Sequence, residues 1–286
     1  MIKHYICAMK TVITTLISLT LSTGIYAQTL KVPAASSGTS ITQKLGIHDV
    51  TLKYNRPNMN GRKIFGGLVP FGSVWRLGAN GIPAITFEDA VSIEGHKIEA
   101  GTYGLFAIPE KDKWTIIVSK KANQWGSYSY SEADDLLRFT VKPATLPYAV
   151  ETYTMSFDNV TPAAAVLSIE WDHTQVQLHL TVDQKAEITA SIDAAMATEK
   201  KPYMQAAQYY YDNNIDIKKA VEYINEADKA QPDVFYIKYW KAKILLKAGD
   251  KAGAVANAKE SLELAKKEKI QEYVNLNNEL LKQAGK

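Results

Sequence analysis

The segment RPNMNGRKIFGGLVPFGSVWRLGAN, residues 56–80, separates two regions in which apolar and polar residues alternate. It contains two prolines, five glycines and three of the four arginines of the chain. Proline and glycine at this density interrupt regular structure, so the segment predicts a long shaped loop. Ordered loops on a β scaffold usually carry function. We therefore expect the binding surface of the protein to be built around residues 56–80.

A period of two surrounds this loop and is typical of half-buried antiparallel strands. The alternating sets are Ile41, Gln43 and Leu45; Val50, Leu52 and Tyr54; Ile85 and Phe87; Trp114, Ile116 and Val118; and Tyr153, Met155 and Phe157. Turn signals lie between them, as at Glu94–Gly95, 109–112 and Asp158–Asn159. Roughly nine or ten short strands over residues 40–182 predict an antiparallel β-sandwich or a jelly-roll-like barrel.

The alternation changes phase near the end of this region. Apolar residues occupy odd positions from Leu167 to Trp171 and even positions from Val176 to Val182. A change of phase moves the apolar side chains to the other face of a strand. We therefore predict a hairpin turn at residues 172–175 between two separate strands.

After Val182 the apolar period becomes helical, and residues 183–286 predict an all-α domain. Five stretches follow a first helix around Ile192, at 203–212, 218–229, 234–247, 251–266 and 270–282. Ala220 and Ala254, 34 residues apart, occupy equivalent positions in the second helix of two pairs. This spacing resembles tetratricopeptide repeats, although the usual early Trp and Gly positions are absent. The domain either offers a groove to a partner or only buttresses the β domain.

The N-terminal residues have the pattern of a targeting segment. Residues 1–27 carry Lys3 and Lys10, no acidic residue, an apolar run and a terminal Ala27, which predicts a signal peptide starting at Met1 or Met9. The run is too short for a membrane span, which needs about 20 apolar residues. We expect a periplasmic or secreted protein with a flexible leader at 28–39, a β domain at 40–182 and no membrane span after cleavage.

Composition narrows the possible chemistry. The one cysteine, Cys7, lies within the predicted signal peptide, so the mature chain has no thiol for disulfides, catalysis or zinc. A formal charge of +3 before cleavage gives no basic footprint for nucleic acid. The histidines show no ligand spacing, and no nucleophile or phosphate-loop motif is present. We assign no catalytic residue, metal or cofactor.

The arginines of the loop have two interpretations. Arg56, Arg62 and Arg76 could converge on a carboxylate or phosphate, which guanidinium groups bind through two parallel hydrogen bonds. They could instead pair with Glu88, Asp89 or Asp134 and hold the loop in place, which we favour. The apolar residues around Arg76 predict burial and a large loss of stability in Arg76→Ala, whereas Arg62→Ala should be nearly neutral. Trp75 is expected in the core.

A second cluster, NQWGSYSY at residues 123–130, contains three aromatic residues beside a glycine. Exposed rings next to amide side chains can stack on a sugar or grip a peptide, because each ring offers an apolar body. The alternative is a loop that caps the open end of the β domain.

Five strings occur in a fixed order: GRKIFGGLVPFGSVWRLGAN, EAGTYGLFAIP, WTIIVSK, NQWGSYSY and LRFTVKP. Together they resemble a secreted bacterial family known as domain of unknown function 2911, over about residues 40–182. The resemblance implies no activity. It implies that signature positions are held by Arg56, Gly61, Arg62, Phe65, Gly66, Trp75, Arg76, Gly78, Asn80, Trp125, Gly126 and Tyr128. In that family an acidic residue commonly follows the Asn, where this chain has Gly81.

We therefore expect a non-enzymatic binding or assembly protein of the cell envelope. Its partners would be a glycan or small anion at the β domain and an envelope protein or peptide at the helical domain. The candidate ligand-binding residues are Arg56, Arg62, Trp75, Arg76, Asn80, Trp125, Tyr128 and Tyr130. The alternative is a hydrolase or carbohydrate-active module that uses the 56–80 loop and Trp125. An enzyme should place a carboxylate or histidine beside Arg62 and Arg76 in a concave pocket.

Overall fold

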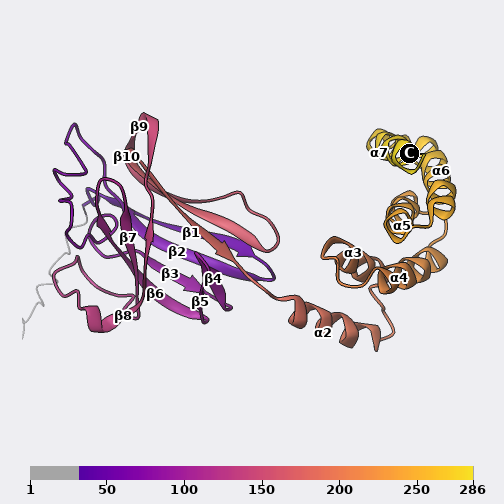
Figure 1. The fold of residues 1–286 in the computed structure, drawn as a ribbon, viewed down its shortest axis with the longest axis horizontal. Helices are drawn as coiled ribbons and strands as arrows, with labels where there is room; N and C mark the ends of the chain where they lie inside the picture. The colour runs from indigo at the N-terminus through magenta and orange to yellow at the C-terminus, as the bar shows by residue number, and fades with distance from the viewer. Residues whose placement is uncertain (1–31, 286) are drawn as a thin grey trace, which may run out of the picture. The chain divides into compact units, whose positions relative to one another are not determined.

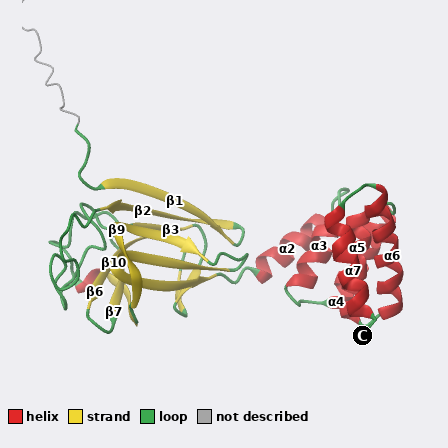
Figure 2. Cartoon of the chain, turned by 90° about the horizontal axis from the view of Figure 1, so that it is seen from above, coloured by secondary structure: helices red, strands yellow, loops and turns green. Residues whose placement is uncertain are grey.

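The computed structural model describes residues 32–285, which form two units that divide after Val182 (Figure 1). The first unit is built of strands and the second of helices, as Figure 2 shows by colour. This confirms the predicted order of a β domain followed by a helical domain. The predicted signal peptide at residues 1–27 lies outside the described residues.

The described part of the β unit contains two antiparallel sheets. The six-stranded sheet has the order β1 (Ser37–Leu45), β2 (His48–Arg56), β3 (Ala84–Phe87), β6 (Gly101–Pro109), β7 (Trp114–Ser119), β8 (Asp135–Val141). The four-stranded sheet has the order β5 (His96–Ile98), β4 (Val91–Ile93), β10 (Ala164–Thr181), β9 (Ala144–Asp158). Strand β1 begins at Ser37, within the predicted leader. The predicted antiparallel sandwich is confirmed.

One hydrophobic core joins the two sheets. Alternate residues of β2, Val50, Leu52 and Tyr54, are buried in it, as their period of two predicts. The Tyr54 hydroxyl also bridges to the facing sheet: it donates to the Met155 carbonyl oxygen at 2.9 Å and accepts from the Met155 amide at 2.9 Å. The buried phenol is thus fully hydrogen-bonded, which fixes the position of β2 against β9.

Residues 56–80 form a long loop, as predicted, and Trp75 fixes its centre to the sandwich. The Trp75 amide donates to the Ala107 carbonyl at 2.7 Å, and the Ala107 amide donates back at 2.9 Å. The indole stacks on Trp171 with ring centroids 6.0 Å apart and meets Tyr153 and Trp114 edge-on. Trp75 is therefore a core residue, as expected, although it belongs to a loop.

The predicted hairpin turn at residues 172–175 is wrong. Strand β10 runs without a break from Ala164 to Thr181 and pairs with β9 on both sides of Asp172. The register shifts at Asp172, whose φ of 54° lies in the left-handed region. The extra residues lie on β9, which advances from Thr154 to Thr145 while β10 advances only from Glu170 to Thr174. The left-handed residue of β10 lies opposite this bulge, and the side chains that follow it occupy the other face. The change of phase in the sequence therefore lies within one long strand, opposite a bulge of its neighbour.

The helical unit consists of antiparallel neighbours. Its helices are α2 (Lys185–Met196), α3 (Tyr203–Asp212), α4 (Ile217–Ala230), α5 (Phe235–Ala248), α6 (Lys251–Lys267) and α7 (Gln271–Ala284). From α3 onward each helix contacts the next, and α5 also contacts α3 and α7. Ala220 and Ala254 are fully buried, as their predicted role in helix pairing requires. None of the helices between residues 32 and 285 has both the length and the apolar character that crossing a membrane requires.

The left-handed backbone of β10 at Asp172 makes a prediction about this residue. Asp172→Val should lower the free energy of unfolding by about 1–2 kcal/mol, because a β-branched side chain clashes with the backbone at positive φ. Asp172→Gly, the matched control, has no Cβ and should keep most of the stability. Urea unfolding followed by tryptophan fluorescence measures both. Equal losses in the two variants would contradict the left-handed backbone.

Candidate functional site

The 56–80 loop encloses a cleft of about 390 Å³ at one end of the β unit. Most of the lining comes from the loop itself, and the rest comes from β10 and the residues before β1. The lining residues are Ala35, Ser36, Pro57, Asn58, Asn60, Arg62, Leu68, Val69, Trp75, Arg76, Gly78, Ala79, Asn80 and Trp171. Four of the predicted site residues, Arg62, Trp75, Arg76 and Asn80, therefore meet in one cleft.

Arg76 is a cleft residue with a buried donor that has no partner among residues 32–285. Its side chain is half-buried, and its Nε is fully buried without a hydrogen-bond partner. The guanidinium forms no ion pair with any carboxylate of residues 32–285. A Cβ built on Gly126 would lie 3.8 Å from Nη1 of Arg76, so this guanidinium reaches the 123–130 loop. A buried cationic donor without an acceptor is costly, and a ligand that supplies an acceptor recovers that cost.

The other two arginines of the loop bind backbone oxygens. Arg62 is exposed, and its guanidinium donates to the carbonyls of Met59 at 2.8 Å and Asn58 at 2.6 Å. Arg56 lies outside the cleft lining and donates to the Tyr153 carbonyl at 3.2 Å and to Thr154 Oγ1 at 2.8 Å. Arg62 therefore holds the turn that contains it, and Arg56 ties β2 to β9.

The predicted pairing of these arginines with Glu88, Asp89 or Asp134 is wrong for the described residues. The Glu88 carboxylate accepts from the Asp49 amide at 3.0 Å, and Asp134 pairs with Lys121 at 2.8 Å. Carbonyl groups of the loop and of β9 lie closer to the guanidinium groups than any of these carboxylates, so Arg56 and Arg62 bind backbone instead.

Asparagine side chains supply further donors and acceptors at the cleft. Asn58, Asn60 and Asn80 line it, and Asn60 and Asn80 both have positive φ, which asparagine tolerates better than most residues. Asn80 also links the cleft to the second loop, because its carbonyl accepts from the Gly126 amide at 2.9 Å. Gly78, with φ 134°, passes so close to Asn55 that a Cβ there would lie 3.0 Å from the Asn55 carbonyl oxygen.

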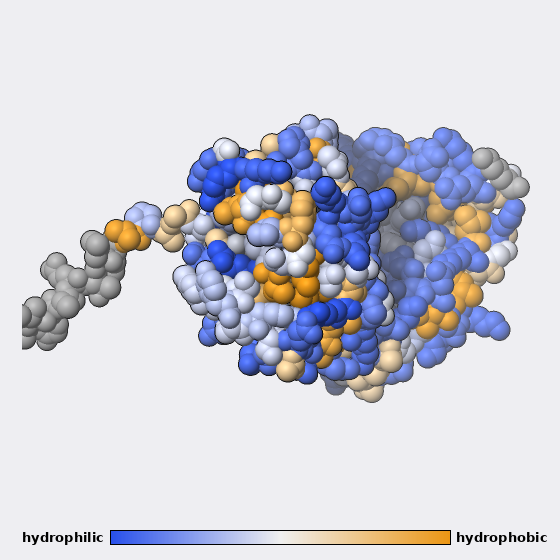
Figure 3. Space-filling model, turned by 60° about the vertical axis from the view of Figure 1, so that its left-hand side comes forward, coloured by the Kyte–Doolittle hydropathy of each residue, from blue (hydrophilic) through white to orange (hydrophobic). Residues whose placement is uncertain are grey.

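Two aromatic residues of the 123–130 loop are exposed beside the cleft, outside its lining. Trp125 keeps 69% of its surface accessible and Tyr128 keeps 85%, as expected of rings that stack on a ligand or cap the sandwich. A backbone bridge between Gly81 and Trp125 holds this loop against the 56–80 loop. Figure 3, which turns the loop end of the β unit forward, shows hydrophobic side chains gathered in patches between polar ones.

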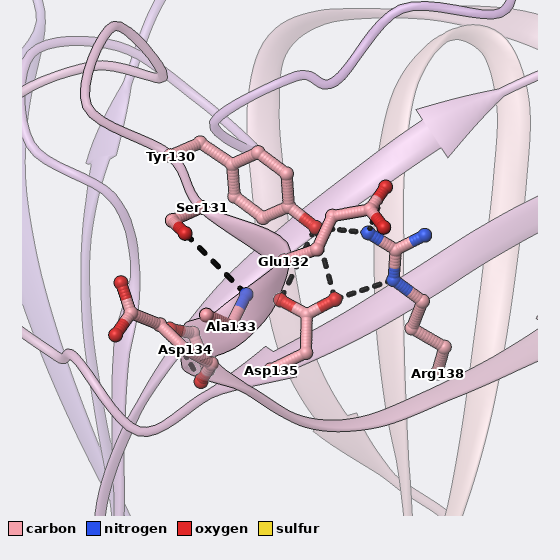
Figure 4. Close-up of polar contacts among 8 residues, drawn as sticks. Tyr130, Ser131, Glu132, Ala133, Asp134, Asp135 and Arg138 are labelled. Atoms are coloured by element: carbon pink, nitrogen blue, oxygen red, sulfur yellow. Dashed lines mark hydrogen bonds and ion pairs between the residues drawn. The ribbon is translucent and has the colours of Figure 1, made fainter.

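Tyr130 is not among the lining residues of the cleft and anchors the second loop through the polar contacts drawn in Figure 4. Its hydroxyl donates to the Asp135 carboxylate at 2.9 Å, and the Arg138 guanidinium donates to both Asp135 and the Tyr130 hydroxyl. A short 3-10 turn, η1 (Glu132–Asp134), separates Tyr130 from β8, and Glu132 pairs with Arg138 at 3.0 Å. Partial burial and the hydrogen bond to Asp135 raise the pKa of Tyr130 above its ordinary value.

The structure adds lining residues that the sequence did not assign to the site. Asn58, Asn60 and Leu68 belong to the 56–80 loop, which the sequence already predicts as the binding surface, so their loop position was a signal for assigning them to the site. Trp171 comes from β10, where its place in an alternating strand indicates only a core residue. Its contribution to the cleft depends on the stacking against Trp75 and has no signal in the sequence.

A family model described as a protein of unknown function, DUF2911, matches residues 36–180. The chain belongs to this family. The match covers both sheets, the cleft from Ser36 onward and the 123–130 loop, so the resemblance drawn from the five sequence strings is confirmed for the β unit. No curated protein matches the chain, and neither does any solved structure. The cleft described above is thus part of the DUF2911 region itself.

The contacts of the two cleft arginines reverse the expected order of their stability effects. Arg62→Ala removes two hydrogen bonds to loop carbonyls and should lower the free energy of unfolding by about 1 kcal/mol. Arg76→Ala removes an unpaired group and should change it by less than about 0.5 kcal/mol. Urea unfolding of the two variants beside the wild type measures both, and a larger loss for Arg76→Ala would show that its guanidinium is paired in solution.

The anchored phenol makes a prediction about pH. The ordinary pKa of a tyrosine is 10.0, and the raised pKa means that folded Tyr130 keeps its proton above this pH. The protonated phenol therefore stabilises the folded state fully below pH 10.0, and this contribution is lost as pH rises through the folded pKa. The wild type should therefore lose stability between about pH 9 and pH 11 more steeply than Tyr130→Phe. Urea midpoints across this range measure it. The wild type and Tyr130→Phe share every other tyrosine. Parallel curves of urea midpoint against pH would therefore contradict a raised pKa of Tyr130.

Proposed function

We propose that the DUF2911 region is the ligand-binding module of a secreted or periplasmic protein, and that its cleft takes a small ligand with an anionic group. The observation that carries this proposal is the half-buried Arg76, whose Nε is buried without a partner among the described residues. Burying a guanidinium donor unsatisfied is unfavourable, so its retention in the cleft favours a role in binding. A carboxylate or phosphate would supply the missing acceptor.

The rest of the lining supports a ligand with a polar ring. Three asparagines offer amide donors and acceptors, and the indoles of Trp75 and Trp171 offer an apolar wall. A volume of about 390 Å³ lies within the usual range for small-molecule sites. Trp125 and Tyr128 add exposed rings beside the cleft, and such rings stack on the apolar faces of sugars. An acidic sugar or a sugar-linked peptide of the envelope combines these features.

The lining groups favour binding over hydrolysis. Guanidinium, amide and indole groups hold a ligand, whereas hydrolysis of a glycoside needs two carboxyl groups on either side of the bond. Glu151 lies close to the lining, but its carboxylate accepts from the Asn60 amide at 2.8 Å. The proposal is therefore a binding protein, and turnover of a bound sugar would identify the alternative hydrolase.

We also propose that the helical unit is a tetratricopeptide-like extension. Two helix pairs, α3–α4 and α5–α6, place Ala220 and Ala254 at equivalent buried positions, and the first helices α3, α5 and α7 contact in series. Asp216 and Asp250 cap α4 and α6 in the same way, each accepting backbone amides of the first turn. The repeated pair supports the assignment. The N-terminal pattern of residues 1–27 supports export to the periplasm or beyond.

The test of ligand binding compares acidic and neutral sugars at the cleft. Galacturonate and muramic acid should raise the unfolding temperature of the wild type, whereas galactose should not, because only the acids supply an acceptor for Arg76. A ligand at 100 times its Kd stabilises by about 2.7 kcal/mol. Arg76→Met should keep its stability and lose this response.

Two controls separate a site effect from a general loss of positive charge. Lys53→Met removes the same charge at an exposed position of β2 and should respond to the acids like the wild type. Arg76→Lys keeps the charge without the planar fork and should respond weakly. If Arg76→Met still responds fully to every acid that stabilises the wild type, the cleft is not the site. If no acidic sugar stabilises the wild type, the proposed ligand class is wrong.

A further inference from the structure

The helical unit has a groove of different chemistry from the cleft of the β unit. Helices α3, α5 and α7 line two hollows of about 380 and 360 Å³ that follow one another along α5, and the end of α4 adds to the first. The first is lined from α5 by Tyr236 and Trp240, and the second by Lys243 and Lys247. Both hollows thus lie along one face of α5, and together we call them the α5 groove.

Aromatic rings form much of the wall of the α5 groove. Tyr211 and Trp240 meet edge-on with centroids 5.9 Å apart, and Tyr239 meets Tyr273 of α7 at 5.4 Å. The ammonium of Lys243 lies 4.2 Å from the Trp240 centroid, and that of Lys247 lies 4.1 Å from the Tyr211 centroid. These cation–π contacts hold two positive charges against the rings.

The two lysines have no carboxylate partner within residues 32–285. Lys247 donates to the Tyr211 carbonyl at 2.6 Å, and Lys243 contacts only the rings by its ammonium. The acidic residue of the lining, Glu279, pairs with Lys282 at 2.6 Å and so leaves these charges uncompensated. Elsewhere on α5, by contrast, Lys238 and Lys241 both bind Asp228.

The geometry points to an acidic peptide as the occupant of the α5 groove: an extended segment of a partner protein whose carboxylates alternate with apolar side chains. Lys243 and Lys247 meet the carboxylates, and the rings from Tyr236 to Trp240 pack against the apolar side chains. The α5 face from Tyr236 to Lys247 spans about 16 Å at 1.5 Å per residue, which matches about five residues of extended chain. This inference does not depend on the ligand of the β unit.

The experiment measures fluorescence anisotropy of a labelled peptide with the full chain. The probe alternates Glu and Leu over about six residues, and the matched control replaces each Glu by Gln. The Glu peptide should bind about tenfold more tightly, equivalent to about 1.4 kcal/mol, and its affinity should fall as salt screens the charges. Equal binding of the two peptides, or binding of neither, would overturn the proposal.

Substitutions place the peptide on the α5 groove. Lys243→Gln with Lys247→Gln should weaken the Glu peptide about tenfold, whereas Lys218→Gln with Lys251→Gln, which removes the same charge outside the groove, should change it less than about twofold. Lys243→Arg with Lys247→Arg keeps the charges and should retain binding, which separates a lost contact from a lost fold. If the Gln pair in the groove binds like the wild type, the site is elsewhere.

Sedimentation of the same proteins tests the other occupant of such a face, a second copy of the chain. The wild type and the groove variant should sediment alike. Self-association of the wild type that the Lys243→Gln and Lys247→Gln pair abolishes would assign the groove to a second copy and overturn the acidic peptide.

Discussion

The burial of Trp75 between two sheets is the constraint on which the cleft of the β unit depends. Two backbone hydrogen bonds to Ala107 and the stacking on Trp171 fix a loop residue as firmly as a strand residue. An indole of this size buries a large apolar surface, so the segment on either side of it cannot leave the sandwich without exposing that surface. Arg76 and Asn80 are held beside the cleft for this reason.

The loop is ordered by hydrogen bonds from guanidinium groups to carbonyls. Arg62 satisfies the Met59 carbonyl oxygen, which a long loop would otherwise leave to solvent, and Arg56 ties the start of the loop to the Tyr153 carbonyl of β9. This use of two arginines leaves Nε of Arg76 without a partner among the described residues, and a ligand role is proposed for this third guanidinium. The arginines of the same segment therefore differ in their acceptors, although their sequence contexts are similar.

The two units carry positive charge in different ways. In the cleft, a single guanidinium lies among amides and buried indoles, an environment suited to a small anion. In the α5 groove, two ammonium groups lie over rings along a helix, and that arrangement suits a longer partner. The two proposed sites use different chemistry, so binding at one unit would not require the chemistry of the other.

The sequence by itself determined the features that depend on neighbouring residues. Alternation along β2 follows from burial of one sheet face. The bounds of α4, α5 and α6 lie within one residue of those predicted. Local hydrogen bonds set these bounds, because Asp216 and Asp250 begin α4 and α6 and Gly249 ends α5. The family of the β unit was also readable from its five strings. Each of these signals lies within a few residues along the chain.

Tertiary structure decided what depends on distant partners. A turn and a bulge both reverse the phase of an alternating strand, and only the pairing of β10 with β9 on each side of Asp172 separates them. The acceptors of Arg56, and the contribution of Trp171 to the cleft, are set by segments about a hundred residues away along the chain. A periodic pattern in the sequence indicates which residues are buried. Which atoms those residues contact is determined by the packing of distant segments.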